Sequence, residues 1–254
     1  MRAMVLAAGL GTRLRPLTDA RPKALVEIAG RTLLEITLTR LRTFGVSDVV
    51  INVHHFPEMI PAYLKAHSNF GMRIEISREE ILLDTGGGLK KAAPLLLAMG
   101  KEDEPILVHN VDVLSTIDLE RVEDYHRENK ALATLAVQAR ETSRYLLFDE
   151  KLQLCGRRRG GNDADGKPVP DEIVRPSHPL QALAFSGIHV ISPRLLSRLT
   201  EDGIFSIVTS YLRLAGQGEE IVAFPADEYY WRDLGTAESL AQAERDLREE
   251  KFRL

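Results

Sequence analysis

Residues 4–23 read MVLAAGLGTRLRPLTDARPK, and this stretch decides the fold. A short apolar strand leads directly into a glycine-rich turn. Gly9 and Gly11 allow the backbone to come close to a ligand and to expose its N–H groups as anion donors. Arg13 and Lys23 bring positive charges to the same turn. Because backbone donors, guanidinium and ammonium groups together suit a polyphosphate, the pattern predicts a phosphate-binding loop.

Two better-known phosphate loops are excluded by residue type. A P-loop requires Gly-Lys followed by Ser or Thr, and this tripeptide is absent from the chain. A dinucleotide-binding fingerprint requires a third small residue after Gly-x-Gly, whereas Thr12, Arg13 and Leu14 stand there instead. The loop therefore does not indicate hydride transfer with a dinucleotide cofactor.

Composition restricts the class of protein further. The 254 residues, 44% hydrophobic and 28% charged, are enough for one α/β domain with a full core. Lys and Arg total 33 against 37 Asp and Glu, and this net charge of −4 argues against nucleic-acid binding. The single cysteine, Cys155, excludes an internal disulfide. No apolar run is long enough to span a membrane. We expect a cytoplasmic protein, either a monomer or a small homo-oligomer.

The order of apolar patterns predicts the architecture. Strands and helices alternate from the N-terminus to residue 130, which is typical of a doubly wound parallel sheet. Beyond it the pattern changes to a hairpin over residues 144–155 and a strand over residues 182–192. A final amphipathic helix is expected within residues 236–254.

Polar residues follow the apolar strand that begins at Pro105. Asn110 and Asp112 stand at its carboxyl end, and the carboxyl ends of parallel strands line the ligand crevice of such sheets. Asp112 is therefore a candidate ligand for Mg²⁺, which prefers hard oxygen donors. The alternative is that Asp112 caps the next helix, although Ser115 and Thr116 are better placed for that role.

A second glycine-rich stretch reads Thr85-Gly86-Gly87-Gly88. Three glycines in succession leave no side chains in the way, so a flat base or ribose has room to lie against the backbone. Backbone N–H and C=O groups at this turn would then recognise the edge of a pyrimidine. The alternative interpretation of three glycines alone is a flexible hinge.

The string LAAGLGTRLRPLT followed by RPKALV resembles the signature of the sugar-1-phosphate nucleotidyltransferases. The resemblance implies an α/β fold with a Rossmann-like, mixed but mostly parallel sheet of the nucleotide-diphospho-sugar transferase type. It also implies that an NTP and a sugar 1-phosphate are converted to an NDP-sugar and pyrophosphate with Mg²⁺. One domain, 1–254, is expected, with a nucleotide-binding half (1–130), a sugar-binding half (131–235) and the C-terminal helix (236–254).

The resemblance also assigns site residues. It gives Arg13, Lys23 and Asp112 catalytic roles, and the W-x-D-x-G-T motif at residues 231–236 makes Asp233 the second metal ligand beside Asp112. The nucleotide-binding residues it implies are Ala7, Ala8, Gly9, Gly11, Thr12, Arg13, Thr85, Gly86 and Gly87. The sugar-pocket residues it implies are Asn110, Phe185, Ser186 and Gly187.

Two departures from the family pattern stand out. Val111 replaces the glycine that usually precedes the strand-end aspartate. The Glu-Lys-Pro tripeptide, whose lysine holds the sugar phosphate in the family, is absent. The resemblance therefore leaves the phosphate of the acceptor sugar without an assigned cation.

Within the family, the chain is most similar to the uridylyltransferases that act on N-acetylmuramic acid 1-phosphate and serve cell-wall metabolism. The short length, the T-G-G-G stretch, the missing Glu-Lys-Pro and the F-S-G-I strand carry this similarity. We therefore predict UTP as the donor. The alternatives are mannose- or heptose-1-phosphate guanylyltransferases, a phosphocholine cytidylyltransferase, and a catalytically silent nucleotide-sugar-binding protein. Retention of both predicted metal ligands argues against the silent protein.

Overall fold

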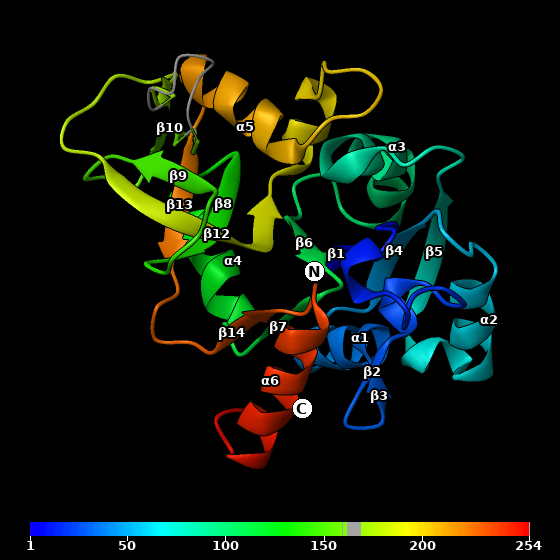
Figure 1. Cartoon of the computed structure of the whole chain (residues 1–254). Helices are drawn as coiled ribbons and strands as arrows, with labels where there is room; N and C mark the ends of the chain where they lie inside the picture. The colour runs from blue at the N-terminus through cyan, green and yellow to red at the C-terminus, as the bar shows by residue number, and fades with distance from the viewer. Residues whose placement is uncertain (159, 162–168, 254) are drawn as a thin grey trace.

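Four short strands run parallel to one another in the central sheet, in the order β6-β1-β4-β5, and β8 and β13 form a further parallel pair. The four strands are β1 (Arg2–Leu6), β4 (Asp48–Val53), β5 (Arg73–Arg78) and β6 (Ile106–Asn110). The computed structural model describes residues 1–158, 160–161 and 169–253 (Figure 1). Since all four strands run the same way, their carboxyl ends meet along one edge of the sheet.

A long strand, β12 (Gln181–Ile191), pairs antiparallel with β6 and extends the sheet into the second half of the chain. The whole ten-stranded sheet has the path β11-β10-β9-β12-β6-β1-β4-β5, and β8 joins β13 to β12. The additional strands are β8 (Ala133–Gln138), β9 (Tyr145–Phe148), β10 (Leu154–Arg157), β11 (Glu172–Ile173) and β13 (Ile221–Pro225). The prediction of a mixed, Rossmann-like α/β fold is confirmed.

Helices cover both faces of this sheet (Figure 1). Alternate residues of a strand point to opposite faces, so Val49 and Ile51 of β4 join one hydrophobic core and Val50 joins the other. The first core is closed by α1 (Leu33–Thr43), α2 (Met59–Ala66) and α4 (Leu119–Glu128). The second is closed by α3 (Asp84–Met99) and α5 (Ile207–Gly216).

A third and smaller core joins the two ends of the chain. Leu14 from the N-terminal loop packs there with Leu234, and with Leu240 from the last helix, α6 (Ala237–Arg248). A two-stranded sheet of β7 (Val113–Ser115) and β14 (Trp231–Asp233) lies beside it. The short remaining elements are η1 (Thr12–Leu14), η2 (Lys23–Leu25), β2 (Glu27–Ile28), β3 (Arg31–Thr32), η3 (Ser68–Gly71) and η4 (Pro193–Arg198).

One local expectation was wrong, and one pair of strands was not anticipated. Residues 85–88 lie in the first turn of α3, which begins at Asp84, and do not form a separate glycine-rich turn. The strand pair β7–β14 was not expected, since each strand has only three residues and neither shows a clear alternation. Within the described part of the chain, no helix is both long and apolar enough to cross a membrane.

Three histidines are buried in the sheet and its helices: His109 on β6, His126 on α4 and His189 on β12. Nδ1 of His126 lies 3.0 Å from the hydroxyl of Thr134, and its Nε2 lies 3.2 Å from the hydroxyl of Ser192. Burial lowers the pKa of His109 and of His126 to about 4, and that of His189 to about 3. All three therefore remain neutral in the folded protein at neutral pH.

These histidines predict a loss of stability on mild acidification. Unfolded histidine titrates near pH 6.5, so below that pH the unfolded chain takes up protons that the folded chain rejects. The free energy of unfolding, measured with urea, should be constant above about pH 6.5 and should fall from pH 6.5 to 5. In the variant His126→Gln the free energy of unfolding should fall less over this pH range, because one of the three buried histidines is absent. A free energy of unfolding that stays constant over this window would contradict the prediction.

Candidate active site

A cavity of about 510 Å³ lies at the carboxyl ends of the parallel strands. The segments that follow β1 and β6 form most of its wall, and residues near the ends of β4, β5 and β14, at the start of α3 and before α5 contribute the rest. Its lining residues are Leu6, Ala7, Ala8, Gly9, Leu10, Gly11, Thr12, Arg13, Lys23, Asn52, Glu79, Leu82, Asp84, Thr85, Asn110, Val111, Asp112, Ile204 and Gly235. The structure therefore brings ten of the predicted site residues to one wall.

The loop after β1 has a backbone that requires glycine at one position. Gly11 has φ +65°, in the left-handed region, and a Cβ atom there would lie 2.8 Å from Cγ2 of Thr18. The hydroxyl of Thr18 donates a hydrogen bond of 2.8 Å to the carbonyl of Gly11. Gly9 differs, because nothing lies within 4 Å of the corresponding Cβ position. The turn is thus held firmly at Gly11 and open to the cavity at Gly9.

A buried polar chain connects this loop to its neighbours. The amide N–H of Ala7 donates to Oδ1 of Asn52 (2.7 Å), and Nδ2 of Asn52 donates to Oε1 of Glu79 (2.6 Å). Oε2 of Glu79 accepts a hydrogen bond from the amide of Leu83 (3.0 Å), just before α3. Asn52 and Glu79 were not among the residues predicted for the site. Asn52 gave the same signal as Asn110, a polar residue near the carboxyl end of an apolar strand.

Cations and carboxylates are paired at the cavity. Lys23 is almost buried, and its ammonium group forms an ion pair with the carboxylate of Asp112. Arg13 is more exposed, and its Nη2 lies 4.0 Å from Oδ1 of Asp233. Because Arg13 and Asp233 are exposed to solvent, their attraction is screened and weak. Both cations are therefore held near the loop by groups that a bound ligand is able to replace.

The β7–β14 pair brings the backbones of the two predicted metal ligands together, although among the described residues Asp112 lines the cavity and Asp233 does not. Asp233 lies opposite Val113 in this antiparallel pair, and the amide of Leu234 donates to the carbonyl of Asp112 (2.8 Å). Oδ1 of Asp233 accepts from the amide of Gly235 (3.0 Å), which lines the cavity. Among the described residues, no group of three or more His, Cys, Asp or Glu forms a ready metal site. Two carboxylates still fit Mg²⁺, which usually keeps waters and takes substrate phosphate oxygens as its other ligands.

The predicted sugar-pocket residues of β12 do not line this cavity. Ser186 is fully buried and its carbonyl accepts from the indole of Trp231 (2.8 Å), while the carbonyl of Phe185 accepts from Arg140 (2.9 Å). Gly187 has φ +72°, and a Cβ atom there would lie 2.7 Å from Nδ2 of Asn110. This strand therefore reaches the cavity only indirectly, by making room for Asn110.

Gly86 and Gly87 do not line the cavity either. The prediction that these glycines leave room for a base or ribose is therefore wrong. Their N–H groups donate to the carbonyl of Phe205 (2.9 and 3.2 Å), so these donors are not free to recognise a base. A Cβ atom on Gly87 would lie 2.7 Å from the carbonyl oxygen of Gly203. These two glycines are needed because the 203–207 segment packs directly on the start of α3.

The 203–207 segment also contributes a side chain to the cavity, Ile204, which was not predicted for the site. Ile204 is 65% exposed and lines the cavity together with Leu82 and Thr85. The hydroxyl of Thr85 accepts a hydrogen bond from the amide of Ile207 (3.0 Å), which fixes the segment beside the cavity. An exposed isoleucine in a polar loop carries no signal in the sequence, because only the fold places it next to α3.

A cavity at the strand ends of an α/β sheet, with a glycine-rich loop, cations and carboxylates around it, is typical of proteins that bind nucleotides. The family model described as nucleotidyl transferase matches residues 2–250. The chain belongs to the nucleotidyl transferase family, a family of enzymes.

Individual relatives agree with this membership. The chain is 35% identical to N-acetylmuramate alpha-1-phosphate uridylyltransferase from Caulobacter vibrioides, over 97% of each chain. It is 30% identical to mannose-1-phosphate guanylyltransferase from Mycobacterium tuberculosis, over 96% of this chain and 64% of that protein. In fold, it superimposes on apo UDP-glucose pyrophosphorylase with a TM-score of 0.77 and 15% identity, over 99% of each chain.

The packing at α3 predicts a specific effect of one methyl group. In Gly87→Ala the new Cβ would meet the carbonyl of Gly203, a backbone atom, so the 203–207 segment must move. Overpacking of this kind costs roughly 1–3 kcal/mol, which thermal and urea unfolding will detect. Because Ile204 moves with the segment, nucleotide affinity should also fall. The matched control is Gly9→Ala, which places its methyl group in open space and should unfold as the wild type does. Equal stability of the two variants would contradict this packing.

Proposed function

We propose that the protein transfers a uridylyl group from UTP to a sugar 1-phosphate, producing a UDP-sugar and pyrophosphate. The observation that carries the proposal is the meeting of Arg13, Lys23, Asp112 and Asp233 around one glycine-rich loop. The similarity to a uridylyltransferase of N-acetylmuramate alpha-1-phosphate, along nearly the whole of both chains, supports the choice of UTP and of an acidic amino sugar.

The chemistry requires alignment and charge neutralisation more than proton transfer. A phosphate monoester has a second pKa near 6, so its attacking oxygen is already ionised at neutral pH. The attack on the α-phosphorus brings two anions together and expels pyrophosphate. Arg13 and Lys23 are proposed to hold the β- and γ-phosphates, and the N–H groups of the loop from Gly9 to Thr12 are proposed to contact the same anion.

Asp112 and Asp233 are proposed to hold the divalent cation that this family generally uses, and we propose Mg²⁺. Bound there, Mg²⁺ would supply positive charge to the phosphate oxygens. In the free protein Asp112 and Lys23 neutralise each other. This ion pair holds both groups beside the loop. With a cation held by Asp112, the ammonium group of Lys23 would be free to contact a phosphate oxygen.

Guanylyl transfer to mannose 1-phosphate is the second candidate, favoured by the similarity to the mycobacterial guanylyltransferase. Uridylyl transfer is preferred because the uridylyltransferase relative matches this chain over its full length and at higher identity. A cytoplasmic location, where NTP is available, and a monomer or small homo-oligomer are part of the same proposal. So is the division into a nucleotide-binding half (1–130) and a sugar-binding half (131–235).

Pyrophosphate release tests this function directly. The assay should pair UTP, dTTP, CTP and GTP with N-acetylmuramic acid, N-acetylglucosamine, glucose and mannose 1-phosphates. We expect UTP and dTTP to be used with a modest preference between them, since a methyl group is worth about 1–3 kcal/mol at most. GTP should be used poorly.

The control for this assay is Asp112→Asn, which keeps the side-chain volume and loses the charge. Loss of several kcal/mol of charge stabilisation should reduce turnover about a hundredfold or more. A clear optimum with GTP and mannose 1-phosphate would replace the uridylyl proposal by the guanylyl one. Nucleotide binding without turnover on any pair would instead favour a silent nucleotide-sugar-binding protein.

A further inference from the structure

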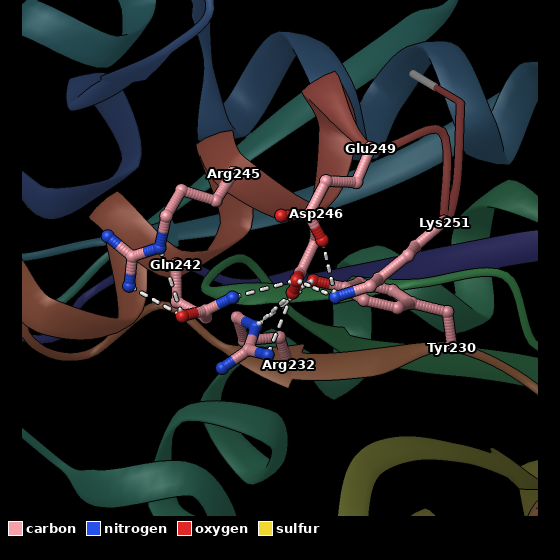
Figure 2. A network of polar contacts seen from close by, with 7 residues as sticks. All are labelled: Tyr230, Arg232, Gln242, Arg245, Asp246, Glu249 and Lys251. Carbon is pink, nitrogen blue, oxygen red and sulfur yellow. Dashed lines mark hydrogen bonds and ion pairs between the residues drawn. The ribbon is translucent and has the colours of Figure 1, made fainter.

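One buried carboxylate at the C-terminal end of the chain binds an unusual number of donors (Figure 2). Asp246 of α6 has a side chain that is only 2% exposed. Its Oδ2 accepts hydrogen bonds from Arg232 Nη2 (2.8 Å), Arg232 Nε (3.1 Å) and the hydroxyl of Tyr230 (2.9 Å). Its Oδ1 accepts from Gln242 (2.8 Å) and Lys251 (3.0 Å). A carboxylate buried in this way is tolerated because every side of it is paired.

Two of these donors, Tyr230 and Arg232, come from the segment that carries Asp233, whereas Gln242 and Lys251 come from α6 and the residues after it. Arg232 directly precedes Asp233 on β14, and neighbouring residues of a strand point to opposite faces. On one face, the indole of Trp231 donates to the carbonyl of Ser186 (2.8 Å), in the central sheet. On the other face, Arg232 reaches back to Asp246 on α6. The strand that carries Asp233 is therefore held from both sides.

This support matters because β14 is weak by itself. It has three residues and pairs with one strand, β7, in a sheet separate from the central one. Isolated two-stranded sheets are marginally stable in water. Asp112 immediately precedes β7, so any shift of β14 along β7 would change the distance between the two carboxylates.

We propose that Asp246 is a positioning residue for the cation site: through Arg232, it holds Asp233 in register with Asp112. The inference rests on the proposed function, because it takes Asp112 and Asp233 as the metal ligands. Groups that orient a metal ligand without touching the metal typically change metal affinity about 10–100-fold when they are removed.

The test is a titration of the purified full-length protein with Mn²⁺ alone, with the free ion followed by electron paramagnetic resonance. Asp246→Asn keeps the size of the side chain and removes the charge that holds Arg232. Its dissociation constant for Mn²⁺ should rise about tenfold or more. In turnover assays, the Mg²⁺ concentration needed for half-maximal activity should rise by a similar factor, and kcat should recover at high Mg²⁺. The KM for UTP at saturating Mg²⁺ should stay within about twofold of the wild-type value.

The matched control is Glu219→Gln, which removes another mostly buried carboxylate far from the cavity. Glu219 forms ion pairs with Arg198 (2.6 Å) and Arg194 (3.7 Å). Removal of its charge should therefore lower thermal stability without changing Mn²⁺ affinity. If Asp246→Asn fails to fold, Arg232→Lys carries the same test, because lysine retains the charge but not the two-nitrogen contact. It should weaken Mn²⁺ binding severalfold.

Unchanged Mn²⁺ affinity in a folded Asp246→Asn or Arg232→Lys variant would overturn the inference and leave the cluster a purely stabilising one. The binding measurement needs no turnover, so its outcome is separate from that of the proposed function. Asp233→Asn sets the scale for complete loss of this ligand. If Asp233→Asn itself leaves Mn²⁺ binding unchanged, Asp233 is not a ligand, and both the cation site and the positioning role are wrong.

Discussion

The site depends on the pairing of two three-residue strands, β7 and β14. Asp112 follows the strand next to β1, whereas Asp233 comes almost at the end of the chain. The hydrogen bond from the amide of Leu234 to the carbonyl of Asp112 closes the chain back on its own N-terminal half. The small core around Leu14 and Leu234 then packs the phosphate loop against the same returning segment. Without this closure, Asp233 would not lie beside Arg13 and Asp112.

Much of the fold was predictable because it follows from local patterns. Continuous apolar runs such as residues 4–8 are typical of strands buried on both faces, which in turn requires helices on both sides. Gly11 was identifiable for a related reason, since its left-handed backbone is one that glycine adopts readily. Polar residues at strand ends, such as Asn110 and Asp112, mark the crevice whatever the ligand is.

What the sequence did not disclose depends on contacts between distant segments. Gly86 and Gly87 were interpreted as space for a base, whereas that space is filled by the segment around Phe205. Glu79 reaches the cavity because it directly follows β5, and Ile204 because its segment packs on the start of α3. The residue type was informative for Gly86 and Gly87, but their partner Phe205 is distant in the sequence, and no periodicity records such a pairing.

The central claim is that Asp112 and Asp233 share one divalent cation beside the phosphate loop. Crystals grown with Mn²⁺ and a non-hydrolysable UTP analogue would test it most directly, through the anomalous signal of manganese. The account predicts a peak within coordination distance of both carboxylates, with Lys23 moved from Asp112 to a phosphate oxygen. A peak bound by only one of the two aspartates, or Lys23 still paired with Asp112 while the nucleotide is bound, would contradict it.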